Sequence, residues 1–191
     1  MKGTLRVIGG SARGLRLKSV PGDTTRPITD IVKEALFNIL GNEIVDNNVL
    51  DLFGGTGAVG IEALSRGAKF VTFLDTGQQA IQTIRANLET TRFTSKAKVS
   101  RIDAFAFLSG QTGLYDLIYV APPQYKEMWQ RAMKLIDERP ELLSDDGQVI
   151  VQINPIEWVE AIYQHFEVFD TRKYGGTLLV FFEKSAVETH D

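Results

Sequence analysis

The 191 residues suit one α/β domain with room for a short appendage. A hydrophobic fraction of 43% and a charged fraction of 24% are ordinary for globular proteins and argue against long disordered stretches. No apolar run approaches the roughly 18 residues that span a bilayer, and the N-terminal residues lack a secretory signal pattern. We therefore expect a cytoplasmic protein that has no membrane partner.

Two residue types that carry much enzyme chemistry are absent or rare. The chain has no cysteine, which excludes disulfides, cysteine-bound zinc and a thiolate nucleophile. Its two histidines, His165 and His190, are too few for a multi-histidine metal site. We expect no metal ion, and because nothing in the sequence demands an oligomer we expect a monomer.

Basic side chains gather near the N-terminus. The net charge is −3, yet residues 1–40 hold seven Lys or Arg and three Asp or Glu, a balance of +4 that leaves −7 for the rest. A basic arm on an acidic body suggests localised contact with phosphates. From charge alone, a solvated face on a small hairpin explains the pattern equally well.

The N-terminal segment has the pattern of a small β-hairpin. Alternating residues 5–8 and 15–18 flank the glycine-rich residues 9–14. We assign residues 1–28 to this arm and residues 29–191 to the main domain. A helix follows, capped by Thr29 or Asp30 and ended by Gly41. Its apolar residues fall on one face: Ile31, Val32, Ala35, Leu36, Ile39 and Leu40.

From residue 48 onward, apolar strand patterns alternate with helical ones. The predicted strands are residues 49–53, 70–74, 98–102, 114–120 and 148–153. The predicted helices are residues 58–66, 77–89, 103–109, 126–138 and 155–164. Such alternation calls for a parallel sheet with helices on both faces. Two last strand patterns, at 166–172 and 177–184, have only a glycine turn between them and predict an antiparallel hairpin.

The first strand of the domain runs into a glycine loop. Asp51, Leu52 and Phe53 are followed by Gly54, Gly55, Thr56 and Gly57, and a helix then begins. Glycines let a ligand approach the backbone, and the helix N-terminus offers free N–H groups. The spacing of Gly55, Gly57 and Gly60 also satisfies the dinucleotide fingerprint, which is weak evidence alone. We expect Phe53, Gly54, Gly55 and Gly57 to line a cofactor site.

Acidic residues at the ends of the first three strands favour one cofactor over the other. Asp51 could bind an ammonium group, such as that of S-adenosylmethionine, whereas a pyrophosphate gains nothing from a carboxylate there. Asp75 could accept from two ribose hydroxyls. Asp103 could accept from an adenine amino group while the Ala104 N–H donates to the ring. Helix capping explains Asp75 and Asp103 as well.

Two prolines end the fourth strand of this series. Ala121, Pro122, Pro123, Gln124 and Tyr125 follow the strand where a methyl acceptor would lie. The prolines stiffen the backbone and leave carbonyl groups facing the crevice. This arrangement points to methylation of an amino group.

Across almost its whole length the chain resembles the RsmD family, bacterial methyltransferases that modify a guanine N2 in small-subunit ribosomal RNA. The resemblance rests on the segments 6–14, 25–30, 34–40, 51–57 and 60–68. It implies a Rossmann-like class I fold with a seven-stranded, mostly parallel sheet. It also implies S-adenosylmethionine as methyl donor and 16S rRNA in the assembling small subunit as partner. Its RNA contacts would be Arg6, Arg13, Arg16, Lys18 and Arg26.

The chain departs from the family at the acceptor loop, where Ala121-Pro-Pro-Gln-Tyr125 replaces the usual Asp-Pro-Pro-Tyr. A carboxylate there would orient the amine, and its loss could lower the rate on the order of 10²–10³. The carbonyls of Ala121 and Pro122, or the Gln124 side chain, could accept the amine protons instead. Tyr125 could still stack on a flipped-out guanine.

Three functions therefore stay open. We expect a methyltransferase acting on guanine N2 in 16S rRNA, with Ala121 to Tyr125 forming the acceptor site. The first alternative is a catalytically weak factor in ribosome assembly that binds RNA and the cofactor. The second is a dinucleotide-dependent oxidoreductase, which only the generic glycine pattern supports.

Overall fold

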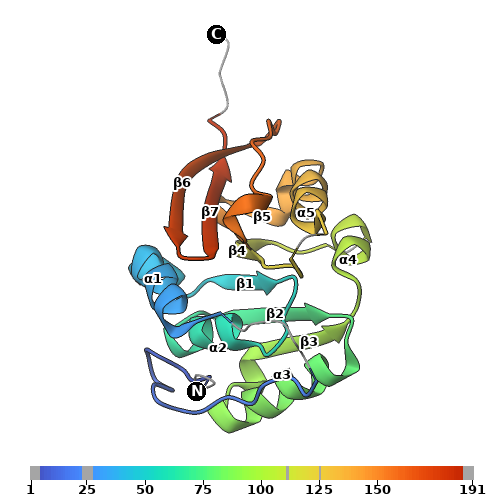
Figure 1. Ribbon diagram of the computed structural model, residues 1–191. Coiled ribbons are helices and arrows are strands. Elements are labelled where there is room, and N and C mark those ends of the chain that lie inside the picture. The colour runs from blue at the N-terminus through green and yellow to red at the C-terminus, as the bar shows by residue number, and fades with distance from the viewer. Residues whose placement is uncertain (1–4, 23–27, 111, 125, 187–191) are drawn as a thin grey trace.

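A computed structural model describes residues 5–22, 28–110, 112–124 and 126–186. Its centre is a seven-stranded sheet in the order β3-β2-β1-β4-β5-β7-β6 (Figure 1). The strands are β1 (Asn48–Asp51), β2 (Phe70–Asp75), β3 (Ala97–Arg101), β4 (Tyr115–Val120), β5 (Leu143–Ile153), β6 (Phe166–Tyr174) and β7 (Thr177–Lys184). Strands β1 to β5 pair in parallel, and β7 runs antiparallel to both β5 and β6. The predicted Rossmann-like sheet with its C-terminal hairpin is confirmed.

Helices cover both faces of the sheet. The α-helices are α1 (Asp30–Leu40), α2 (Ala58–Ser65), α3 (Gln78–Thr91), α4 (Ala104–Gly110) and α5 (Met128–Asp137). Short 3-10 turns occupy Gly41–Ile44, Thr94–Lys96, Pro140–Leu142 and Pro155–Glu157. Within the described ranges, no helix is long and apolar enough to cross a membrane.

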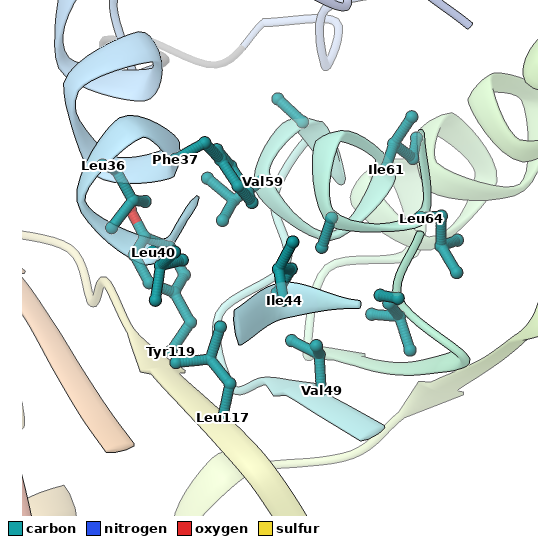
Figure 2. Packing of buried hydrophobic residues seen from close by; sticks show 14 of the residues in the cluster. Leu36, Phe37, Leu40, Ile44, Val49, Val59, Ile61, Leu64, Leu117 and Tyr119 are labelled. Atoms are coloured by element: carbon teal, nitrogen blue, oxygen red, sulfur yellow. The ribbon is translucent and has the colours of Figure 1, made fainter. Parts of the chain in front are cut away.

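The alternation of side chains along the strands divides the core into two clusters. Val49 of β1 and Leu117 of β4 pack with α1, α2 and α3 in the first cluster, part of which Figure 2 shows. Leu50 and Ile118, their neighbours along the chain, face the other way and pack with α4 and α5. Strands buried on both faces explain why these segments read as continuous apolar runs.

Helix α1 begins and ends where the sequence predicts, and its buried face agrees with the prediction in part. Thr29 caps it by accepting a hydrogen bond from the Val32 N–H at 3.3 Å. Ile31 and Ile39 were expected on the buried face, and they are 72% and 36% exposed. Val32, Leu36 and Leu40 are buried as predicted, and Phe37, which was not expected there, is buried too and brings more apolar surface than either isoleucine.

The helix predicted at residues 155–164 is wrong. Only the 3-10 turn Pro155–Glu157 forms there, and the chain then runs irregularly to β6. Trp158 stacks on Trp129 of α5 with ring centroids 5.4 Å apart. Helix α5 and Trp158 thus fill the sheet face that an added helix would cover. The apolar side chains of Ile156, Val159 and Ile162 in this segment are exposed.

The arm, which we define as described residues 5–22, pairs with itself as an antiparallel loop. Arg6 and Arg16 form one isolated bridge, and the N–H groups of Val7 and Leu17 donate to Leu15 and Leu5 at 2.9 and 2.8 Å. The predicted hairpin is present, but it is too short to form strands. The arm shares the first core cluster through buried Leu5, Val7, Ala12 and Leu17. A domain boundary at residue 28 stays a prediction.

Candidate active site

The carboxyl ends of β1 to β4 meet at one edge of the sheet. Strand β1 lies between β2 and β4, so that Asp51 pairs with Phe73 on one side and Tyr119 on the other. The fold thereby gathers the loops that follow these four strands. They carry the predicted cofactor residues from Asp51 to Ala104 and the predicted acceptor residues Ala121 to Gln124. Tyr125 and Arg26 lie outside the described residues.

Asp51 is a buried carboxylate with one oxygen atom that lacks a hydrogen-bond partner among the described residues. Its side chain is 2% exposed, and its Oδ1 atom makes no hydrogen bond within the part of the chain that the structure describes. Burial raises its pKa to about 7, and the negative charge of Asp75 acts in the same direction. A backbone hydrogen bond from Phe53 opposes them. A buried charged group in this state is costly, and a cation bound beside it would remove that cost.

The glycine loop is folded tightly above Asp51. Gly54 donates to the Leu74 carbonyl at 2.7 Å, and Gly55 donates to Asp75 Oδ2 at 2.9 Å. Gly57 has a φ of +78° and caps α2, a conformation that L side chains rarely adopt. Gly60 has another role, because a Cβ atom there would lie 2.3 Å from the Phe73 ring. The third glycine of the pattern therefore serves the packing of α2 on β2.

The other two carboxylates of the site, Asp75 and Asp103, accept hydrogen bonds from backbone N–H groups. Besides Gly55, Asp75 accepts from Gly77 at 2.7 Å through Oδ1. Asp103 accepts from the Ala106 N–H at 2.9 Å. It thereby caps α4, which is the helix-capping role that the sequence also allowed. Ala104 is buried as the first residue of α4. Each carboxylate oxygen can accept more than one hydrogen bond, so a ligand hydroxyl or amine can still bind.

An aromatic and cationic stack borders the glycine loop. Phe53 packs edge-on against Phe105 of α4, with ring centroids 6.2 Å apart. Arg131 of α5 lies over the same Phe105 ring, 4.0 Å from its centroid. Only Phe53 was expected here, because the sequence gives no sign that α4 and α5 contact each other through this pair.

The acceptor loop leaves β4 on the same edge. Ala121 and Pro122 are half-buried, whereas Pro123 and Gln124 are exposed. Two residues before Ala121, on β4, the Tyr119 hydroxyl donates to Gln152 Oε1 at 2.5 Å. Burial holds the pKa of Tyr119 well above its ordinary value, and the charge of Asp51 adds to this shift. Tyr119 is therefore a neutral hydrogen-bond donor that supports the floor of the site.

The basic residues of the arm face solvent. Arg13, Arg16 and Lys18 are exposed, and Arg6 and Arg16 line an open hollow together with Gly14 and Asp30. The Arg6 Nε atom lies 3.0 Å from Asp30 Oδ2, and both side chains are substantially exposed. The basic side chains of the arm are therefore accessible to a ligand from solvent.

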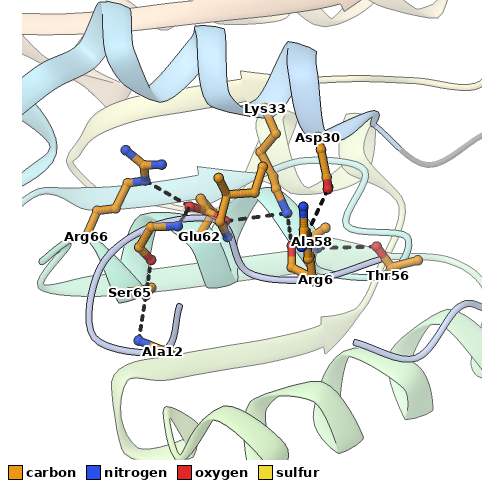
Figure 3. A network of polar contacts seen from close by, with 11 residues as sticks. Arg6, Ala12, Asp30, Lys33, Thr56, Ala58, Glu62, Ser65 and Arg66 are labelled. Carbon is orange, nitrogen blue, oxygen red and sulfur yellow. Dashed lines mark hydrogen bonds and ion pairs between the residues drawn. The ribbon is translucent and has the colours of Figure 1, made fainter. Parts of the chain in front are cut away.

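A buried network anchors the arm to α1 and α2 (Figure 3). Glu62 accepts from the N–H groups of Ile8 and Gly9 at 2.9 and 2.7 Å. It also pairs with Arg66 at 2.8 Å and with the fully buried Lys33 at 3.4 Å. Burial lowers the pKa of Lys33, and its attraction to Glu62 opposes that shift. We did not predict this pair, although both charges interrupt otherwise apolar helix faces.

Metal binding has no support within residues 5–22, 28–110, 112–124 and 126–186. No group of three or more His, Asp or Glu side chains is placed there to hold an ion.

Comparisons with known proteins agree with this geometry. Residues 5–183 match the family described as conserved hypothetical protein 95. YlbH of Bacillus subtilis, provisionally named an rRNA methyltransferase, is 38% identical over 94% of this chain and 99% of its own length. Ribosomal RNA small subunit methyltransferase D of Escherichia coli is 34% identical over 78% of this chain and 75% of its own.

Solved structures show the same relationship. That of yhhF from Escherichia coli, provisionally named a methyltransferase, superposes with a TM-score of 0.84 at 30% identity. The match covers 96% of this chain and 99% of the other. The chain therefore belongs to the family of conserved hypothetical protein 95, the RsmD family that its sequence resembles.

Proposed function

We propose that the protein uses S-adenosylmethionine to methylate ribosomal RNA, at a guanine N2 of 16S rRNA in the assembling small subunit. The observation that carries this proposal is Asp51, a buried carboxylate with a free oxygen beneath a glycine loop. The small-subunit methyltransferase D of Escherichia coli, 34% identical, supports the choice of substrate.

The residues present fit the proposed cofactor. Asp51 would bind its ammonium group, and Asp75 would accept from its ribose hydroxyls. Asp103 would accept from the adenine amino group, and the N–H of Ala104 is available because it lies in the first turn of α4. When bound, the cofactor supplies a methyl group on a sulfonium. A dinucleotide fits less well, because its pyrophosphate would approach the negative charges of Asp51 and Asp75.

The acceptor loop would hold and orient the guanine amino group. In Ala121 and Pro122 the backbone carbonyls can accept the amine protons, and the exposed Gln124 side chain offers a further oxygen. Tyr125 would stack on the flipped-out base. Positioning is then the main catalytic contribution of the protein, since no residue forms a covalent bond.

The test is to incubate the protein with radiolabelled S-adenosylmethionine and unmethylated small subunits, then to identify the labelled nucleoside. We expect N2-methylguanosine. The Asp51→Asn protein serves as a control that should incorporate little label. A label on another nucleoside would refute the guanine N2 assignment, and no label from a protein that binds cofactor would refute the enzyme.

Ala121 favours one second function, that of an assembly factor that binds RNA and cofactor but methylates poorly. Replacing Ala121 by Asp and deleting Gln124 should then raise the rate by about 10²–10³. If the same change abolishes an existing activity, the loop as it stands is a working acceptor site.

A further inference from the structure

We propose that Asn87 couples the glycine loop to the arm, so that cofactor bound at the loop tightens the binding of RNA by the arm. This inference rests on the proposed function. It assigns Asn87 as a positioning residue that contacts neither ligand.

Asn87 of α3 is fully buried and joins two segments that are far apart in sequence. Its Oδ1 accepts from the Lys18 N–H at 2.7 Å, and its Nδ2 donates to the Lys18 carbonyl at 3.0 Å. The same Nδ2 donates to the Thr56 carbonyl at 2.9 Å. One amide thus holds both backbone groups of an arm residue and one carbonyl of the glycine loop. Only an amide side chain supplies this set of one acceptor and two donors at that reach.

The contacts continue on both sides of Asn87. Thr56 follows Gly55, whose N–H is held by Asp75, the residue assigned to the ribose. Lys18 follows Leu17, whose N–H closes the arm onto Leu5. A short path of hydrogen bonds and one peptide bond therefore connects Asp75, the carboxylate assigned to the cofactor ribose, with the arm.

The second attachment of the arm leads to the same loop. Glu62 and Ser65 hold Ile8, Gly9 and Ala12, and both lie on α2, the helix that begins directly after Gly57. The arm has little regular structure of its own, so its position depends on these helix side chains as well as on its buried apolar residues. A ligand that orders the glycine loop also orders the carbonyl to which Asn87 donates. RNA binding then loses less conformational entropy, which gives positive coupling.

A hollow lies on the surface next to Lys18, the arm residue that Asn87 holds. Lys18, Ser19 and Pro21 line a hollow against Gln79, Gln82 and Thr83 of α3. Lys18 is exposed there, while its backbone is held by Asn87. A movement of the Thr56 carbonyl would be passed through Asn87 to the Lys18 backbone at the edge of this hollow.

The experiment measures the affinity for small-subunit RNA with and without saturating S-adenosylhomocysteine, which binds without turnover. The wild-type protein should bind RNA at least about 5-fold more tightly when S-adenosylhomocysteine is present. In Asn87→Ala this ratio should fall to about 1 while each ligand still binds alone. Asn87→Asp is a second variant, which keeps the acceptor for the Lys18 N–H but loses the donor to the carbonyls of Thr56 and Lys18.

Thr91→Val is the matched control, because Thr91 is buried in the same helix and its hydroxyl bonds only to carbonyls of α3. It should lose some stability and keep the wild-type ratio. Amide hydrogen exchange gives an independent readout: S-adenosylhomocysteine should slow exchange at Val7 and Leu17 in the wild type and not in the Asn87 variants.

Several results would overturn the inference. They are a wild-type ratio of 1, an unchanged ratio in both Asn87 variants, or an equal loss in Thr91→Val. If both Asn87 variants fail to fold, unchanged exchange at Val7 and Leu17 in the wild type overturns it, and slowed exchange supports it. A protein that methylates RNA with a ratio of 1 refutes the coupling alone, whereas one that binds neither ligand refutes the proposed function too.

Discussion

The glycine loop and the arm are both irregular segments held by neighbouring side chains, yet they treat charge in opposite ways. At the loop, Asp51 is buried with its Oδ1 atom unpartnered among the described residues, and its pKa is raised to about 7. On the arm, Arg13, Arg16 and Lys18 are exposed to solvent. A small cation is bound best by a desolvated carboxylate, whereas a polyanion needs cations that it can reach. The two regions are thus suited to ligands of opposite charge.

Because the charge is buried at the loop and exposed on the arm, the two regions should respond differently to pH and ionic strength. Interactions between exposed charges are screened by salt beyond about 10 Å at 0.1 M, whereas buried charges are screened much less. We therefore expect the loop to respond to pH and the arm to respond to ionic strength. The following changes test this division, from the largest expected effect to the smallest.

Glu62→Gln should cause the largest loss of stability, because it removes the anchor of the arm. The substitution leaves Lys33 as a buried cation without its carboxylate, which costs about 3–5 kcal/mol in free energy of unfolding. Denaturant titration followed by tryptophan fluorescence measures this loss. Combining it with Lys33→Met should recover part of the stability, because the unpaired charge is then absent. If the double variant is as unstable as the single one, the ion pair is not the cause.

Asp51→Asn should weaken cofactor binding about 10- to 150-fold, the value of one charge-assisted hydrogen bond of 1.5–3 kcal/mol. Calorimetric titration with S-adenosylhomocysteine measures the loss, and RNA binding without cofactor should stay unchanged. Equal cofactor affinity in the two proteins would show that Asp51 does not contact the ligand.

The same variant should be more stable than the wild type at neutral and higher pH. The folded pKa of Asp51, about 7, lies above its ordinary value of 3.8, so its contribution is most favourable when the carboxyl is protonated. That contribution is lost as the pH rises from about 4 to about 7. Unfolding midpoints measured between pH 5 and 8 should therefore diverge in favour of Asp51→Asn. Parallel curves would contradict the raised pKa.

Charge reversal on the arm should give a smaller effect that depends on salt. Arg13→Glu with Arg16→Glu removes two cations, so the slope of log affinity for RNA against log salt should decrease by about 2. Cofactor affinity should stay nearly intact in the same protein. Reversal of Lys98, a basic residue on β3 outside the arm, is the matched control. An unchanged slope in the arm variant would remove the arm from the RNA-binding surface.

Cofactor affinity should rise by about tenfold between pH 6 and pH 8 in the wild type. A carboxylate with a pKa of about 7 is mostly protonated at pH 6 and mostly ionised at pH 8, and only the ionised form pairs with the ammonium group. Titrations across this range should show the rise, and Asp51→Asn should show none. A flat profile in the wild type would place another group beneath the ligand.

The sequence was sufficient for the parts of the fold that are governed by local pattern. The strands of the parallel sheet and the glycine loop follow from apolar runs that end in Asp51 and Asp75, and both residues lie where expected. The exposed Ile31 and the missing helix at residues 155–164 were not predictable in this way. Their surroundings depend on how Phe37 and Trp158 fill the core, which is decided by the tertiary structure.

The polar links between distant segments were the least predictable feature. Asn87 and Glu62 look like ordinary helix residues, and their partners on the arm lie 69 and 53 or more positions away. Their role appears only when the arm, α2 and α3 are brought together. The basic arm residues could be chosen from the family resemblance, whereas the side chains that hold the arm could not.

The buried carboxylate of Asp51 also affects how long the protein persists in a cell. A ligand that binds only the folded state raises its population in proportion to ligand concentration. Above neutral pH, where Asp51 is mostly ionised, its burial lowers the stability of the protein without cofactor and so reduces the margin against unfolding and proteolysis. The lifetime of the protein would then follow the supply of methyl donor, and synthesis without that donor would yield a shorter-lived chain.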